Sequence, residues 1–241
     1  MTEPKTILSY QADGLDFRSE LYVKENGDRA RPGVLVFPEA FGLGEHVRSK
    51  AIRLAELGFA ALACDLHGNA HLETDLDAAI GLINPLRADP MKTRERAQAA
   101  LAALSARPEA DAGRIAAIGY CFGGTMALEL GRSGADIKAI AGFHSGLSTT
   151  RPEDGKNIRA KVMVAIGADD PAIPPEQRLA FEEEMRKGSV DWQMMLYGGV
   201  VHSFTNPKAA ELNRPEFARY DKYADEHSFW SMIELFKVAL A

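Results

Sequence analysis

The sequence predicts an α/β fold with a doubly wound, mostly parallel sheet, helices on both faces and an antiparallel N-terminal edge. Short apolar runs alternate with longer amphipathic segments along most of the chain. Several of the apolar runs contain almost no polar residue, as expected of parallel strands that are buried on both faces. The first two runs alternate polar and apolar residues instead, which is typical of an antiparallel edge. The repeated strand–helix alternation implies right-handed crossovers between neighbouring strands.

Eight strands and six helices are expected, within one domain that spans residues 1–241. The expected strands are Thr6–Ser9, Arg18–Val23, Gly33–Phe37, Ala60–Cys64, Arg114–Gly119, Ala139–Phe143, Val162–Gly167 and Trp192–Tyr197. The expected helices lie near residues 45–57, 73–87, 93–106, 122–132, 175–187 and 222–239, the second ending near Asn84-Pro85 or just after it. Residues 198–221 form an irregular loop, and so long a loop inside a compact domain is more often functional than idle.

The composition is that of a globular protein, and it lacks the excess of basic residues that binding to nucleic acid or anionic lipid requires. The formal net charge is −6 at pH 7, so neither nucleic acid nor a membrane surface is an expected partner. The N-terminal residues 1–5 lack an apolar signal core, and no run of ~18 apolar residues occurs. The two cysteines, Cys64 and Cys121, are far apart, which suits a reducing compartment better than a disulfide framework. These observations predict a cytoplasmic protein.

One turn in the sequence has the layout of a nucleophile elbow. An apolar run leads into Gly119-Tyr120-Cys121-Phe122-Gly123-Gly124, and a helical pattern follows. This strand–turn–helix order matches G-x-S-x-G with sulfur in place of the hydroxyl. The flanking glycines allow close approach of the neighbouring backbone, and a helix N-terminus favours a thiolate. The alternative is a small buried cysteine in a tight strand–helix turn.

Acidic residues and a histidine follow two other expected strands. Asp169 and Asp170 come directly after the seventh strand, and His202 comes shortly after the eighth. Ligand sites in open α/β sheets lie beyond the carboxyl ends of the strands, so these residues can meet Cys121 there. The order Cys121…Asp170…His202 is that of α/β-hydrolase triads, in which the histidine moves protons and the acid orients it. Taken singly, either aspartate can instead cap the next helix, and His202 can be a surface residue.

Other motifs point less clearly to chemistry. His67 and His71, followed by Glu73, have a spacing that a metal ion could use, but their Gly-Asn turn favours two exposed loop histidines. The elbow is not G-x-G-x-x-G, and no acid follows a second strand about 20 residues on, which disfavours a dinucleotide site. His144 follows a strand, where it can line the site or serve only in packing. We expect no metal ion and no cofactor.

Six segments of the chain form a more specific pattern than the elbow alone. They are Phe37–Leu43, Ala63–Gly68, Gly119–Gly124, Phe143–Gly146, Gly167–Pro174 and Val201–Phe204. Together they resemble the dienelactone hydrolase (carboxymethylenebutenolidase-like) family of the α/β-hydrolase superfamily. The elbow cysteine combined with the early Pro38-Glu39 makes this resemblance specific. It implies the α/β-hydrolase fold and a cofactor-independent hydrolase of esters or lactones.

The resemblance also implies roles for individual residues. The family pattern G-x-x-D-x-x-[IV]-P selects Asp170 as the triad acid and leaves Asp169 to cap a helix or face solvent. It places Glu39 beside the nucleophile, where the carboxylate can hydrogen-bond the resting thiol and change partner when substrate enters. A carboxylate there disfavours a thiolate by charge, so its use is in gating. The alternative is a strand-end carboxylate that only binds loop amides.

The remaining implied groups concern the substrate. An oxyanion hole needs two donors, for which the backbone N–H groups of Ala40 and Phe122 are expected. Ser203 matches the family pattern and can donate to a substrate oxygen.

The segment after Phe204 departs from the pattern of the dienelactone-specific members. Those members place an arginine there to hold the substrate carboxylate, whereas this chain has Thr205–Pro207. Arg87, Arg94 and Arg96 lie where another substrate-binding arginine would be sought, and the sequence does not select among them. Ester or lactone hydrolysis is therefore a better supported expectation than dienelactone hydrolysis itself.

Three hypotheses about function follow, all with a small-molecule substrate or ligand. The leading one is a cysteine hydrolase that forms a thioester acyl-enzyme on Cys121. The second is a catalytically idle α/β-hydrolase scaffold that binds a small molecule. The third is a redox or peroxide sensor that uses Cys121 alone, against which the lack of a resolving cysteine nearby counts. The sequence specifies neither the acyl group nor the oligomeric state.

Overall fold

A computed structural model describes residues 4–24 and 29–241 of the protein. Residues 1–3 of the N-terminal segment discussed above lie outside the described residues. The strands are β1 (Thr6–Ala12), β2 (Leu15–Tyr22), β3 (Arg31–Phe37), β4 (Ala60–Ala63), β5 (Ala110–Tyr120), β6 (Ala139–Phe143), β7 (Lys161–Gly167) and β8 (Trp192–Tyr197). The helices are α1 (Glu45–Glu56), α2 (Leu76–Ala88), α3 (Pro90–Ser105), α4 (Phe122–Arg132), α5 (Pro175–Lys187) and α6 (Lys222–Ala239), with 3-10 turns η1 (Pro152–Asn157) and η2 (Ala209–Leu212).

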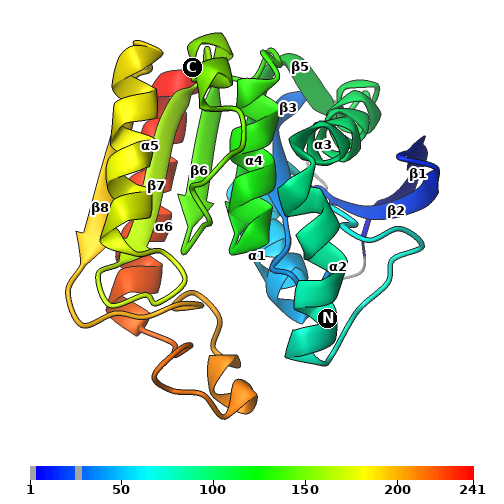
Figure 1. The fold of residues 1–241 in the computed structure, drawn as a ribbon. Helices are drawn as coiled ribbons and strands as arrows, with labels where there is room; N and C mark the ends of the chain where they lie inside the picture. The colour runs from blue at the N-terminus through cyan, green and yellow to red at the C-terminus, as the bar shows by residue number, and fades with distance from the viewer. Residues whose placement is uncertain (1–3, 25–28) are drawn as a thin grey trace.

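All eight strands join one sheet in the order β1-β2-β4-β3-β5-β6-β7-β8 (Figure 1). The β1–β2 and β2–β4 pairs are antiparallel, and every pair from β4 to β8 is parallel. The predicted mostly parallel sheet with an antiparallel N-terminal edge is thus confirmed. Parallel strands point their carboxyl ends to the same edge, so the loops after β3, β5, β7 and β8 meet there.

The helices cover the two faces of the sheet separately, because alternate strand residues point to opposite faces. Leu35 and Phe37 of β3 face one hydrophobic cluster, which α2, α3, α4 and α5 complete. Val34 and Val36 face the other cluster, which α1 and α6 complete. Figure 1 shows α5 and α4 in front of the sheet and the red α6 behind it. The buried strands β3 to β7 therefore read as nearly continuous apolar runs.

Two helix boundaries differ from the sequence prediction. Helix α2 begins at Leu76 rather than near residue 73, because Asp75 caps its N-terminus by accepting from the Ala78 N–H at 2.8 Å. The helix continues through Pro85 to Ala88. Helix α3 begins at Pro90, which lacks the N–H that a first-turn position would leave unpaired.

The long segment between β8 and α6 is irregular, as predicted, apart from the short η2. Across the described ranges, no helix is both long and apolar enough to cross a bilayer.

Candidate active site

Cys121 stands at the tip of the turn between β5 and α4 with a strained backbone. Its φ is 53° and its ψ is −120°, a conformation that residues with a Cβ rarely adopt. A Cβ at Gly119 would lie 2.0 Å from the Gly123 carbonyl oxygen, and one at Gly123 would lie 2.4 Å from the Phe37 carbonyl oxygen. Both positions must therefore be glycine for strand, turn and helix to pack this closely. Cys121 is half-buried and lines a cavity, so its side chain is not apolar filler.

His202 lies between Cys121 and Asp170. Its Nδ1 atom is 2.7 Å from Asp170 Oδ2, and its ring also interacts with the Cys121 side chain. Burial by itself lowers the pKa of His202, but the charge of Cys121 and the hydrogen bonds to Asp170 and Cys121 outweigh it and raise this pKa to about 10. The surroundings of His202 therefore favour its protonated form.

The long loop before α6 fixes the position of the His202 ring. The His202 N–H donates to the Phe217 carbonyl at 3.0 Å, and the His202 carbonyl accepts from the Arg219 N–H at 3.1 Å. The Phe217 ring stacks on the imidazole, with ring centroids 5.4 Å apart. This loop is thus part of the site, as its length suggested.

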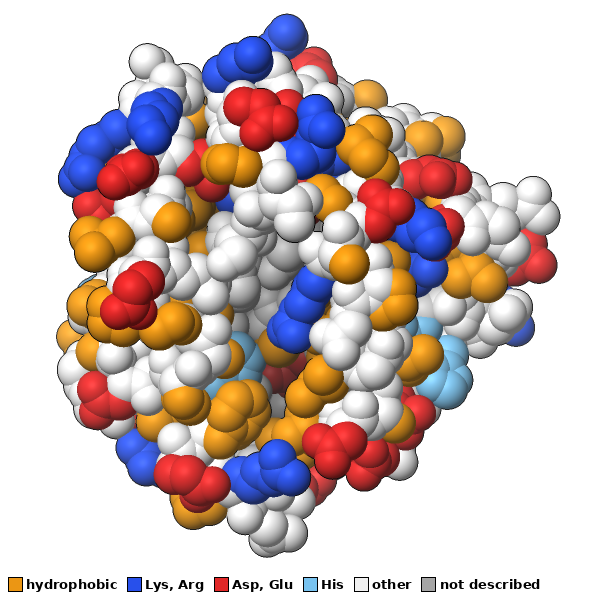
Figure 2. Space-filling model, viewed as in Figure 1, with side chains coloured by type: hydrophobic (Ala, Val, Ile, Leu, Met, Phe, Trp, Pro, Cys, Tyr) orange, Lys and Arg blue, Asp and Glu red, His pale blue; other side chains and the backbone are white. Residues whose placement is uncertain are grey.

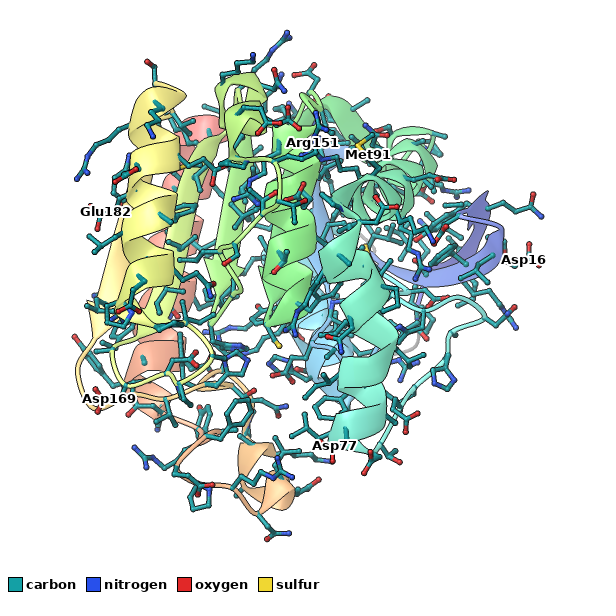
Figure 3. The ribbon with its side chains drawn as sticks, viewed as in Figure 1. Asp16, Asp77, Met91, Arg151, Asp169 and Glu182 are labelled. Carbon is teal, nitrogen blue, oxygen red and sulfur yellow. The ribbon has the colours of Figure 1, made fainter. Side chains whose placement is uncertain are left out.

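Of the two adjacent aspartates, Asp170 is the one turned inward. It is buried, and its second oxygen, Oδ1, accepts from the Ala172 N–H at 2.8 Å. Asp169 is exposed at the outer edge of the loop after β7 (Figure 3). Helix α5 starts at Pro175 without a side-chain cap, so neither aspartate serves that purpose.

Glu39 is buried at the end of β3 and lines the same cavity as Cys121. Its Oε1 accepts from the Ser203 hydroxyl at 2.8 Å, and its Oε2 accepts from the Asn206 amide at 2.7 Å. His46 Nδ1 approaches Oε2 to 3.4 Å. Within the described chain, the hydrogen bonds of the Glu39 carboxylate thus come from the Ser203 and Asn206 side chains, and neither from the Cys121 thiol nor from backbone N–H groups.

Two backbone N–H groups flank the elbow with no acceptor among the described residues. Phe122 opens α4, so its N–H is one of the four that a helix leaves unpaired. Ala40 lies in the loop after β3, and its N–H is likewise unpaired in the described structure. Both are therefore available to a ligand oxygen.

The cavity beside Cys121 has a volume of about 500 Å³ and opens on the face shown in Figure 2, where hydrophobic side chains gather around the hollow. Its lining combines apolar side chains with hydroxyl and amide groups. The apolar lining residues are Phe41, Leu76, Ile80, Ile83, Leu86, Ile173, Leu212 and Phe217. The hydroxyl and amide groups include those of Thr125, Ser148, Thr149, Thr150 and Gln177.

The structure places the two tentative substrate-binding residues, His144 and Ser203, in different surroundings. His144 does not line the cavity: it is fully buried behind Cys121, whose N–H donates to His144 Nδ1 at 3.2 Å. Burial, with the nearby His202, holds the pKa of His144 well below its ordinary value, so this ring is neutral. Ser203 does line the cavity, but its hydroxyl proton is donated to Glu39 rather than being free for a substrate.

The structure also separates the arginines and histidines that the sequence left open. Only Arg87 lines the cavity; Arg94 pairs with buried carboxylates, and Arg96 pairs with Asp13 at 2.6 Å. His67 is half-buried, with Nε2 2.7 Å from the Ala40 carbonyl oxygen, whereas His71 is exposed as expected. Over residues 4–24 and 29–241, no group of three or more His, Cys, Asp or Glu side chains is arranged to hold a metal ion.

Three residues near the site carried no signal in the sequence. Asn206 anchors Glu39, Thr205 is bonded to His144, and His46 approaches both Glu39 and Thr205. Each contact joins segments more than 60 residues apart. Only the fold brings these partners together, so their spacing along the sequence does not predict these contacts.

Comparison with known proteins gives a consistent answer. The sequence pattern of the dienelactone hydrolase family matches residues 18–240. A Bradyrhizobium protein named "Probable 2-oxo-3-(5-oxofuran-2-ylidene)propanoate lactonase" is 29% identical over 183 residues, which cover 72% of this chain and 73% of that protein. Two solved structures each cover 98% of both chains. One, titled "m3DLH", is 43% identical with a TM-score of 0.93, and the other, a dienelactone hydrolase-like promiscuous phosphotriesterase from metagenomic libraries, is 42% identical with a TM-score of 0.92.

The TM-scores show that both solved structures share the fold described above over nearly the whole chain. A further homologue, from Escherichia coli, is named "Putative carboxymethylenebutenolidase" and is 24% identical over 222 residues, which cover 88% of this chain and 79% of that protein. The chain therefore belongs to the dienelactone hydrolase family of the α/β-hydrolase superfamily and is a hydrolase of carboxylic esters or lactones.

Proposed function

We propose that the protein hydrolyses its ester or lactone through a Cys121–His202–Asp170 triad, by way of a thioester acyl-enzyme. The observation that carries this proposal is the position of His202, which interacts with the Cys121 side chain on one side and binds Asp170 at 2.7 Å on the other. The raised pKa of His202 supports an imidazolium in the resting enzyme, beside the Cys121 side chain that it would activate. Asp170 fixes the tautomer and stabilises the imidazolium.

The first half-reaction forms the thioester. The Cys121 thiolate attacks the substrate carbonyl carbon, and the carbonyl oxygen takes the negative charge. The unpaired N–H groups of Ala40 and Phe122 stabilise this oxyanion. When the intermediate collapses, the C–O bond to the alcohol breaks and His202 gives its proton to the leaving alkoxide.

The second half-reaction releases the acid. Neutral His202 takes a proton from a water molecule, whose oxygen attacks the thioester carbon. The C–S bond then breaks, the carboxylic acid leaves, and the thiolate and imidazolium are restored. The His202 imidazole therefore carries the proton in both half-reactions, while Phe217 and Asp170 hold this ring in place.

The walls of the cavity indicate the class of substrate. An ester or lactone with an apolar group fits against the residues of α2, while a hydrogen-bonding substituent fits against residues 148–150 and Gln177. Arg87, whose side chain is exposed, is the one arginine or lysine among the described lining residues. A compact, mostly apolar ester or lactone with few polar groups therefore matches this site.

Replacement of Cys121 by alanine tests the proposal. We expect the variant to lose at least about a thousandfold in kcat/KM for p-nitrophenyl acetate and for a small lactone. Wild-type enzyme stopped in acid during turnover should carry an added acyl mass on Cys121, detected by peptide mass spectrometry. Cys64→Ala serves as the matched control, because Cys64 is fully buried away from the cavity. Full hydrolysis by Cys121→Ala would overturn the proposal.

A further inference from the structure

The loop after β3 carries one of the two backbone N–H groups proposed to stabilise the oxyanion, that of Ala40. This N–H can serve only if it points at the carbonyl oxygen of a bound substrate, and a loop without anchors would let the peptide rotate away. The contacts that hold this loop in place therefore bear directly on catalysis.

Three successive carbonyl groups of this loop, those of residues 39, 40 and 41, all accept a hydrogen bond. The Glu39 carbonyl accepts from the Gly42 N–H at 3.0 Å, and the Phe41 carbonyl accepts from the Glu73 N–H at 2.9 Å. The carbonyl between them, that of Ala40, lies 2.7 Å from Nε2 of the His67 side chain. Of the three, the Ala40 carbonyl is thus the one that the described structure ties to a side chain rather than to backbone.

The contact with Ala40 fixes which nitrogen of His67 carries a proton. A carbonyl oxygen accepts and cannot donate, so the proton lies on Nε2. Burial lowers the pKa of His67, and although the bond to Ala40 raises this pKa, the nearby His71 and Arg96 add to the lowering. The neutral ring with its proton on Nε2 is therefore the resting form, and this form donates to the loop.

The loop also packs closely against the segment that carries His67. Gly42 has a φ of 95°, and a Cβ there would lie 2.5 Å from the His71 carbonyl oxygen and 3.0 Å from the His67 ring. On its other side the loop meets the elbow, because a Cβ at Gly123 would lie 2.4 Å from the Pro38 carbonyl oxygen. The loop therefore lies between the elbow and the segment that carries His67, and it touches both.

We propose that His67 is a positioning residue of the oxyanion hole, which keeps the Ala40 N–H directed at the oxyanion by donating to the Ala40 carbonyl. The inference rests on the proposed function, because it requires an oxyanion beside Cys121. His67 does not line the cavity, so it acts through the loop and touches no substrate atom. Since the charge on the substrate oxygen develops only during the reaction, this bond should favour the transition state over the bound substrate.

Replacement of His67 by leucine tests the inference in two assays. His67→Leu removes the donor but keeps an apolar side chain in its place. For p-nitrophenyl acetate, kcat should fall about tenfold with little change in KM, because both half-reactions pass through an oxyanion. Alkylation of Cys121 by iodoacetamide should keep its wild-type rate, because displacement of iodide at a tetrahedral carbon creates no oxyanion.

Two further variants serve as controls for the donated proton. His67→Gln can place an amide N–H close to the position of Nε2, and it should recover most of the lost kcat. His71→Gln changes an exposed histidine of the same segment and should behave as the wild type in both assays. Equal losses of kcat in His67→Leu and His67→Gln would contradict the inference, because they would make ring packing the cause.

The remaining outcomes separate this inference from the proposed triad. A folded His67→Leu variant with wild-type kcat would overturn the inference, as would an equal loss in hydrolysis and in alkylation, which would place the damage at the thiol. If His67→Leu does not fold, His67→Asn decides, because its shorter amide does not reach the Ala40 carbonyl; wild-type kcat in that variant contradicts the inference. Hydrolysis that survives Cys121→Ala would defeat the proposed triad instead, whichever result the His67 variants give.

Discussion

The two ends of helix α4 carry two buried polar clusters that differ in how fully their groups are paired. The C-terminal end holds an ion network: Arg132 bonds Glu184 at 2.7 Å and Glu129 at 2.9 Å, and Arg94 bonds Glu129 at 2.8 Å. The N-terminal end holds Cys121 with the other groups of the proposed triad and an open cavity. Both clusters are deeply buried, so burial alone does not distinguish structure from chemistry.

The two clusters differ in how many of their hydrogen-bonding groups at the cavity already have a partner in the protein. Both oxygens of Glu129 are occupied by arginines, although this side chain forms part of the cavity wall. At the other end, two backbone N–H groups lack partners in the described structure, and the half-buried thiol of Cys121 faces the cavity beside the His202 ring. Unused hydrogen-bonding capacity that faces a cavity is therefore the better sign of a reactive site.

The largest expected effect comes from Asp170→Asn, which tests the reactive end of the helix. An amide at this position can hold His202 in the wrong tautomer and cannot stabilise its charge, so kcat/KM should fall by about a thousandfold. The free energy of unfolding should change far less. Asp169→Asn is a matched control at the next residue, and it should retain wild-type kcat/KM because Asp169 is exposed. Equal losses in the two variants would remove Asp170 from the triad.

The next largest effect tests the paired end. Arg132→Met leaves Glu129 and Glu184 buried without their common partner, and we expect a loss of about 3–5 kcal/mol in unfolding free energy. Denaturant unfolding measures this loss. Lys138→Met breaks the exposed pair with Asp136 and should cost less than about 1 kcal/mol. An equal loss of unfolding free energy in Arg132→Met and Lys138→Met would contradict this prediction.

The pH dependence of the unfolding free energy should also differ between the clusters at the two ends of α4. The pKa of His202 is raised to about 10 in the folded state, against about 6.5 when unfolded. The stability that this proton contributes is fully present below pH 6.5 and is lost as the pH rises through 10. The stability gap between wild type and His202→Gln should therefore narrow by about 1 kcal/mol or more between pH 6.5 and 10. The gap for Arg132→Met should stay constant, because burial lowers the pKa of Arg132 but its two carboxylates more than offset this and raise it.

The sequence allowed the sheet and the reactive end to be predicted, for a physical reason. Buried parallel strands must be apolar along their whole length, and the elbow requires glycine at fixed positions, so both leave a local pattern. All eight strands occur where they were expected. The elbow and the two loops after β7 and β8 then meet at one edge because the sheet is parallel.

The ion network at the C-terminal end of α4 and the contacts of His46 left no such local pattern in the sequence. Arg94 and Arg132 read as ordinary charges on amphipathic helices, and His46 as a polar residue near a helix start. Their partners come from distant segments: Glu184 lies 52 residues from Arg132, and Thr205 lies 159 residues from His46. Charge pairing across a core depends on three-dimensional packing, which no spacing along the chain records.

The smallest expected effect concerns Arg87, the cavity-lining counterpart of the buried Arg94. Its guanidinium lies 5.9 Å from the Phe122 ring centroid and is exposed to solvent, so its attraction for a substrate carboxylate is screened. Arg87→Met should raise KM about threefold for mono-p-nitrophenyl succinate and leave p-nitrophenyl acetate unchanged. Added salt should reduce the wild-type preference for the anionic ester in the same direction. An equal change in KM for both esters would show that Arg87 shapes the cavity by volume alone, which would make it a wall residue rather than a recognition group.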